Sequence, residues 1–175
     1  MNKAPPLQYH PPLAMLTNFN ERFVLAHEYC HTPHDAFDIV HTGIEFGEAY
    51  ASDAIAFDLV AQSGRELDLV PPNMSTQGSY FVLTALGVIR EALDVARFGA
   101  VQPDTGFLGH PPVAARIDAL RAWYRAKVSQ DDPMLALKAA LYPAGTLRLL
   151  WDRLRDEGVA MRWKGRALDG VWAGV

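Results

Sequence analysis

One stretch of this 175-residue sequence decides how the rest is interpreted: Phe23-Val24-Leu25-Ala26-His27-Glu28-Tyr29-Cys30-His31. His27 and His31 are four residues apart, so on a helix they lie about 40° apart around the axis and point the same way. Two imidazoles in this arrangement can bind one tetrahedral metal ion together. The apolar residues before them indicate that the histidines belong to a partly buried helix.

Local signals predict where this helix begins and ends. Asn18 followed by Glu21 resembles an N-terminal capping pair. Pro33 lacks the amide hydrogen that a continuing helix needs, and its ring clashes with the preceding turn. We therefore expect a helix from about Phe19 to about Thr32, with His31 in its last turn.

Glu28 directly follows the first histidine and lies on the rim of the same face. A carboxylate there can take a proton from an attacking water and later return it to a leaving amine, acting first as a general base and then as a general acid. A histidine pair at this spacing also occurs in ordinary helices, so the motif needs support from the rest of the chain. A hydrolytic zinc site requires a third protein ligand and one open position.

The next acidic segment, residues 43–60, has apolar positions at helical spacing, and we expect a helix from Glu45 to Val60. With this segment the chain resembles the gluzincin zinc metallopeptidases, in particular soluble bacterial relatives of the CaaX prenyl endopeptidases. In that family a second helix supplies a glutamate ligand and, four residues later, an aspartate that orients a ligand histidine. The resemblance implies Zn²⁺ as the cofactor, Glu48 as the third metal ligand after His27 and His31, and Asp53 as a partner of an imidazole.

The spacing of these two acids departs from the family pattern. Glu48 and Asp53 are five residues apart, which separates them by about 140° on a regular helix. The helix could carry a one-residue bulge, Ser52 could replace the aspartate, or Asp53 could itself be the ligand. Glu45 is a further alternative, and all of these acids would also suit a solvated helix face.

A third part of the resemblance lies in residues 109–120, where a His-Pro pair is followed by an arginine and an apolar helix. It implies that His110 approaches the active site as a catalytic group that hydrogen-bonds the oxyanion of the reaction, and that Arg116 anchors the segment. Two prolines after a glycine are also an ordinary helix start.

The fold class predicted from the whole pattern is mainly α. We expect a compact zincin-like helical domain over residues 1–130 and a small helical or winged-helix-like tail over residues 131–175. Gly99 and Gly158 stand where left-handed residues would end helices. The remaining helices are expected at Ser79–Phe98, Val113–Val128, Pro133–Tyr142 and Thr146–Glu157.

The tail has a weaker signal of its own. A turn at residues 142–145 between its two helices, followed by another at Lys164-Gly165, resembles a winged helix-turn-helix, and several arginines give local positive charge. Acidic residues on the same helix, and the apolar pattern of a hairpin packed on the core, favour a structural role instead.

Composition limits the expected partners and location. The net charge of −4 gives no electrostatic footprint for nucleic acid, and a single cysteine suits a reducing compartment. No apolar run reaches the roughly twenty residues that a bilayer span needs, and prolines occupy the place of a signal-peptide core. We expect a cytoplasmic protein without a membrane span.

Peptidases of this type place a β-strand before the metal helix, where it binds the extended substrate. The prolines in residues 7–16 disfavour a strand there, so a partner chain or the C-terminal tail would have to supply one, unless the peptidase is compact or degenerate.

Two functions follow from the sequence. The first is a zinc endopeptidase that acts on a protein or peptide substrate, with Glu28 as general base. The second is a degenerate gluzincin scaffold that serves as a regulatory, DNA-binding or protein-binding module in stress response or phage defence.

Overall fold

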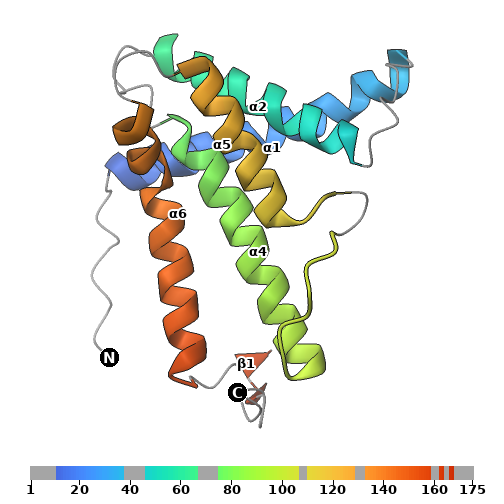
Figure 1. Cartoon of the computed structure of the whole chain (residues 1–175), viewed down its shortest axis with the longest axis vertical. Helices are drawn as coiled ribbons and strands as arrows, with labels where there is room; N and C mark the ends of the chain where they lie inside the picture. Colours follow the sequence, from blue (N-terminus) through green and yellow to red (C-terminus); the bar gives the residue numbers. More distant parts are fainter. Residues whose placement is uncertain are drawn as a thin grey trace, which may run out of the picture.

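The computed structural model describes residues 11–37, 46–66, 75–106, 110–128, 133–158, 162–163 and 166–167. Over these ranges the chain is mainly α-helical, which confirms the predicted fold class (Figure 1). The helices are α1 (Pro11–Phe37), α2 (Gly47–Glu66), α4 (Gln77–Phe98), α5 (Val113–Val128) and α6 (Pro133–Asp156). Two short antiparallel strands, β1 (Arg162–Trp163) and β2 (Arg166–Ala167), follow α6.

Helix α4 is the central element of the bundle. It packs against α1, α5 and α6, while α1 and α2 pack along each other. In Figure 1, α1 and α2 cross one end of the molecule, and α4 and α6 run side by side along its long axis. The β1–β2 pair lies toward the opposite end from α1 and α2. None of the helices in the described ranges combines the length and the apolar character that a bilayer crossing requires.

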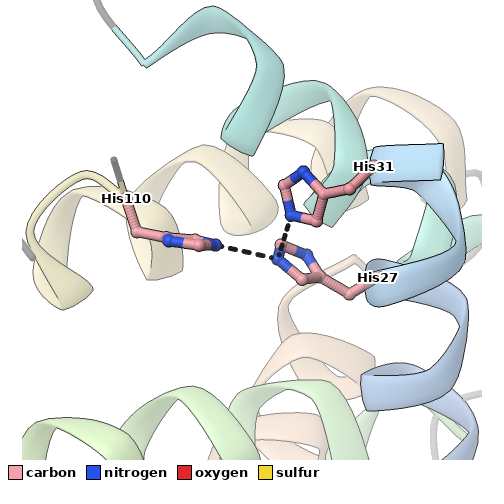
Figure 2. Close-up of side chains that lie close together, drawn as sticks. All are labelled: His27, His31 and His110. Carbon is pink, nitrogen blue, oxygen red and sulfur yellow. Dashed lines mark hydrogen bonds between the residues drawn. The ribbon is translucent and has the colours of Figure 1, made fainter. Parts of the chain in front are cut away.

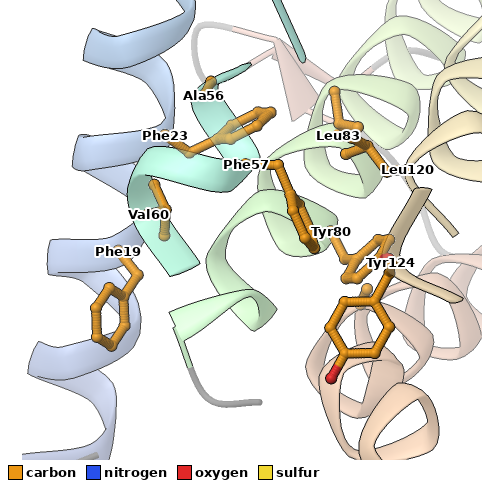
Figure 3. Packing of buried hydrophobic residues seen from close by; sticks show 10 residues of the cluster. Phe19, Phe23, Ala56, Phe57, Val60, Tyr80, Leu83, Leu120 and Tyr124 are labelled. Atoms are coloured by element: carbon orange, nitrogen blue, oxygen red, sulfur yellow. The ribbon is translucent and has the colours of Figure 1, made fainter. Parts of the chain in front are cut away.

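The hydrophobic core lies where α1 and α2 meet α4 and α5 (Figure 3). Phe57 of α2 is its centre, with edge-to-face contacts to Tyr80, Trp123 and Tyr124 at ring-centroid distances of 5.7, 5.5 and 5.9 Å. Such contacts add to the burial of large rings and hold helices in fixed relative positions. The core therefore fixes the end of the bundle that carries the histidine motif.

The apolar face of α1 explains how the motif is placed. Phe19, Phe23 and His27 follow one another at four-residue spacing and are all buried, so His27 continues the core face of the helix. Cys30 lies on the buried side as well, and burial raises the pKa of its thiol. The first histidine is thus held by the packing of the same helix face that builds the core.

Helix α1 is longer than predicted at both ends. It begins at Pro11, so Pro11 and Pro12 occupy the first turn, where a proline needs no amide donor. Asn18 is inside the helix and does not cap it.

At its C-terminal end, α1 continues through Pro33 to Phe37. A proline so close to a helix end removes a single hydrogen bond, and the packing of α1 along α2 outweighs that loss. Residues 11–16 are helical, which excludes a substrate-binding strand there.

Helix α6 is also longer than predicted, because the expected turn at residues 142–145 does not form. The helix runs from Pro133 to Asp156 with Pro143 in its interior. Ala144 is buried in the core cluster, and Thr146 donates its hydroxyl to the carbonyl of Tyr142 at 3.0 Å. Burial against the bundle outweighs the turn preference of the local sequence. A winged helix-turn-helix needs that turn, so the DNA-reading interpretation of the tail loses its basis.

The predicted helix stops are confirmed. Gly99 follows α4 with φ of 75° and donates its amide to the carbonyl of Val95 at 2.9 Å. Gly158 follows α6 with φ of 62°. Both adopt the left-handed conformation that glycine reaches without strain. Helix α5 has the predicted bounds, and α4 begins two residues earlier than expected.

Candidate metal centre

Three imidazoles from two distant parts of the chain meet near α1 (Figure 2). The Nε2 atom of His27 lies 3.1 Å from Nε2 of His31 and 3.1 Å from Nε2 of His110. One nitrogen from each ring lies within 4.8 Å of the other two. Figure 2 shows His27 and His31 extending from one helix and His110 approaching from the other side.

The outer nitrogens of two of these rings face carboxylates. Nδ1 of His31 lies 2.9 Å from Oε1 of Glu48, and Nδ1 of His27 lies 3.0 Å from Oδ1 of Asp53. A neutral imidazole has one donor nitrogen and one acceptor nitrogen. With Nδ1 of His31 donating to Glu48, its Nε2 presents a lone pair to the centre of the cluster, and the carboxylate of Asp53 beside Nδ1 of His27 favours the same arrangement there. At 3.1 Å, each facing pair of Nε2 atoms needs a proton or a metal ion between the two nitrogens.

Asp53 is the buried anchor of the cluster, at 1% exposure. Arg116 of α5 donates to both of its oxygens, from Nε and from Nη2, each at 2.7 Å. Burial alone would raise the pKa of Asp53. The hydrogen bonds from Arg116 and the contact with His27 outweigh it and hold the pKa below its ordinary value, so the carboxylate stays ionised. The anion therefore fixes His27 of α1 and Arg116 of α5 to α2.

The cluster is closed at one end and partly open at the other. His27 is buried, at 5% exposure, and its partners Asp53 and Arg116 are buried too. The side chains of His31 and Glu48 are 29% and 30% exposed. Solvent or a ligand can therefore reach the cluster from the His31 side, while the His27 side is held rigid inside the bundle.

Contacts of the described residues on either side of His110 place it at the cluster. Asp104 accepts hydrogen bonds from the amides of Gly106 and Val113, at 3.2 and 2.9 Å, and so joins the start of α5 to the chain before it. Gly106 has φ of 87°, and a Cβ atom there would lie 2.4 Å from the carbonyl oxygen of His110. Only glycine fits this close approach. The position of His110 thus depends on Asp104 and Gly106.

The structure brings together four of the five residues that sequence analysis selected. His27, His31 and His110 form the cluster, and Glu48 contacts the outer nitrogen of His31. Glu28 is exposed and has no hydrogen bond or ion pair to another described residue. His110 supplies the third nitrogen of the group that could hold a metal ion. Glu45 lies outside the described residues.

The five-residue spacing of Glu48 and Asp53 needs neither a bulge nor a substitution by Ser52. Helix α2 is a regular α-helix through both residues. The two acids serve different imidazoles, one on His31 and the other on His27. Because they face different rings, their side chains need not point the same way around α2.

Sequence analysis places His110 near the site as an oxyanion partner, and it does not predict that its imidazole joins those of His27 and His31 in one cluster. The signal for this position in the sequence is the His-Pro pair at residues 110–111, to whose histidine the resemblance assigns contact with the oxyanion.

Comparisons with family models, with curated proteins and with solved structures found no match for this chain.

Proposed function

We propose that this protein is a zinc-dependent hydrolase of the metallopeptidase class. Its metal would be held by Nε2 of His27, His31 and His110. The observation that supports this proposal most strongly is the convergence of three imidazole nitrogens, from His27, His31 and His110, within 4.8 Å of one another. Two of the rings have an outer-nitrogen carboxylate, which is the usual environment of a metal-binding histidine.

The spacing of the nitrogens suits zinc. With zinc–nitrogen bonds of about 2.0–2.1 Å, two nitrogens of a tetrahedral site lie roughly 3.3–3.4 Å apart. The two Nε2 separations that involve His27, 3.1 Å each, are close to that value, and all three ligand nitrogens lie within 4.8 Å of one another. A structural zinc site has four protein ligands, whereas a catalytic zinc site has three and one open position. Three imidazoles therefore fit a catalytic site. When bound, zinc supplies Lewis-acid chemistry that polarises a carbonyl and makes water a better nucleophile.

The protein residues around this site have separate tasks. Asp53 and Glu48 fix the orientation and tautomer of His27 and His31. Glu28 follows His27 on α1 and is exposed, so its carboxylate is available to take a proton from water and pass it to a leaving amine. As a ligand, His110 would hold the metal through Nε2, and this nitrogen would then not be available to donate to an oxyanion.

The assignment of peptides as substrates rests on the resemblance of the motif and of the acidic helix to the gluzincin peptidases. The partly open His31 side of the cluster supports it, because a substrate carbonyl needs access. The buried His27 side supports the same reading, since a rigid inner shell keeps the ligands in place during turnover.

The test compares hydrolysis of a fluorogenic peptide library by the zinc-loaded wild type, Glu28→Gln and Glu21→Gln. Glu21 is the matched control, because it is also an exposed glutamate of α1. We expect Glu28→Gln to lose about 10²–10⁴-fold in rate while keeping zinc and fold, and Glu21→Gln to retain the wild-type rate. Stoichiometric zinc without hydrolysis of any peptide by the wild type would refute the peptidase proposal and leave a metal-binding scaffold. Equal rates for the two variants would refute the role of Glu28.

A further inference from the structure

A groove separate from the histidine cluster lies between α4, α5 and α6 and encloses about 400 Å³. No residue of α1 or α2 lines it among the described parts of the chain. Its size falls in the range of small-molecule sites. Gly87, Ala114, Ala144 and Gly145 keep side-chain volume low along it, and Ile117 adds apolar surface. A Cβ atom added at Gly145 would have no neighbour within 4 Å, so the groove is open there.

Three arginines reach this groove, one from each helix: Arg90 of α4, Arg121 of α5 and Arg148 of α6. Arg90 is engaged by Asp94 at 3.0 Å and by the carbonyl of Gln102. Arg148 forms ion pairs with Glu91 and Asp152. These two guanidinium groups are therefore largely fixed by the fold.

The Nε atoms of Arg90 and Arg121 are both buried without a hydrogen-bond partner among the described residues, but Arg121 has fewer other contacts. Its Nη1 donates to Asp118 at 2.9 Å, a surface residue of the same helix whose side chain is 70% exposed. Its Nε is buried and has no hydrogen-bond partner among the described residues. A buried donor without an acceptor costs free energy, so a ligand that supplies an acceptor there would be stabilised. Arg121 can offer two parallel N–H donors to a carboxylate or a phosphate.

The two carboxylates of the groove do not neutralise Arg121. Asp104 accepts the amides of Gly106 and Val113. Glu91 accepts from Arg148 and from Nε1 of Trp151, the latter at 2.8 Å. Both acids are thus satisfied by other donors. The groove combines an apolar floor with a cation whose inner donor is unused.

We propose that this groove binds a small organic anion, with a carboxylate or phosphate head on the guanidinium of Arg121 and an apolar body along the α4–α5–α6 floor. The head-group chemistry follows from the fork of Arg121, whose Nε has no acceptor among the described residues. The apolar body follows from the small and aliphatic residues that line the rest of the groove. The site makes no use of the histidine cluster, so it can be tested on the full chain without added metal.

Isothermal titration calorimetry with hexanoate, hexyl phosphate and 1-hexanol tests the proposal. We expect one anion to bind per chain and hexanol to bind at least about tenfold more weakly. In Arg121→Gln the affinity for the anion should fall about tenfold or more, as for the loss of a hydrogen bond to a charged group. The stronger of the two anions identifies the head group. Arg125→Gln is the control, because Arg125 is an exposed arginine one turn further along α5 and does not line the groove.

Three results would overturn the proposal. The first is no saturable binding of either anion by the wild type. The second is equal weakening in Arg121→Gln and Arg125→Gln, which would indicate unspecific surface charge. The third is binding of hexanol as tight as that of the anions, which would show an apolar groove without anion recognition. The melting temperature of Arg121→Gln is measured in parallel, and Arg121→Lys, which keeps the charge but not the fork, should bind with intermediate affinity.

Discussion

Asp53 is the residue on which the candidate metal centre most depends. It connects α2 to α5 through both oxygens and to α1 through His27, and all three side chains are buried. A buried ion pair is a modest source of stability when complete, because desolvation offsets much of its attraction. Removing one partner is costly, since the other charge then stays buried without compensation.

We therefore expect Asp53→Asn to lower the free energy of unfolding by about 3–5 kcal/mol in urea denaturation. Asp118→Asn is the control, because Asp118 pairs with Arg121 on the surface of one helix and should contribute less than about 1 kcal/mol. The double variant Asp53→Asn with Arg116→Gln should be less destabilised than the sum of the single variants, because the two side chains interact directly. Equal effects of Asp53→Asn and Asp118→Asn would contradict the anchoring role.

At the residue scale, the sequence indicated which residues belong to the site better than it indicated their roles. The four-residue spacing of His27 and His31 is a local property of a helix, so the pair could be predicted. Whether Glu48 or His110 completes the cluster depends on how α2 and the loop before α5 dock on α1. Docking is a tertiary property that local spacing does not contain.

At the scale of elements, α1 and α4 approach each other closely at Gly78. A Cβ atom added at Gly78 of α4 would lie 2.7 and 2.8 Å from backbone atoms of Phe19 and Asn20. Backbone atoms cannot move aside as a side chain can, so we expect Gly78→Ala to destabilise the protein by about 1–3 kcal/mol. Gly145→Ala in α6 is the opposite case, because its Cβ would meet nothing within 4 Å. It should stabilise the protein by up to about 1 kcal/mol, as alanine does in a helix. Thermal denaturation of both variants measures the difference, and the same sign for both would contradict this packing.

The continuity of α6 leads to a second prediction at this scale. Pro143 lies inside the helix, where a proline costs up to about 3 kcal/mol relative to alanine. Pro143→Ala should therefore raise the melting temperature without lowering the helical circular dichroism signal. Pro112→Ala, just before α5, should give no such gain, because proline suits a helix start. A loss of stability in Pro143→Ala would indicate the turn that the local sequence favours.

Element types were predictable from the sequence, whereas some boundaries were not. Helices α4 and α5 match their apolar periodicity and their glycine or proline signals within two residues. Helices α1 and α6 pass through Pro33 and Pro143, at which local rules predict an end or a turn. Both helices pack along a neighbour, and that burial outweighs the local cost of a proline.

At the scale of the whole molecule, α4 shares packing surfaces with α1, α5 and α6, and Ala144 of α6 belongs to the same core cluster as Phe19 of α1. We therefore expect one cooperative unfolding transition in calorimetry, with no separate transition for residues 131–175. Zinc that binds only the folded chain should raise the temperature of this single transition, by the equivalent of about 2.7 kcal/mol at a hundredfold excess over its Kd. A second transition insensitive to zinc would show that the tail folds separately.

The three-histidine centre is tested most directly by the zinc affinity of the wild type, His110→Ala and Glu48→Gln, measured by competition with a chromogenic chelator on protein purified without a metal column. We expect one zinc ion per chain in the wild type. Glu48→Gln should weaken the affinity by about 10–100-fold, as expected for the loss of an orienting partner, and His110→Ala should weaken it further, because a ligand is removed. Stoichiometric zinc that persists in His110→Ala but disappears in Glu48→Gln would contradict the three-histidine centre and assign the third ligand to Glu48.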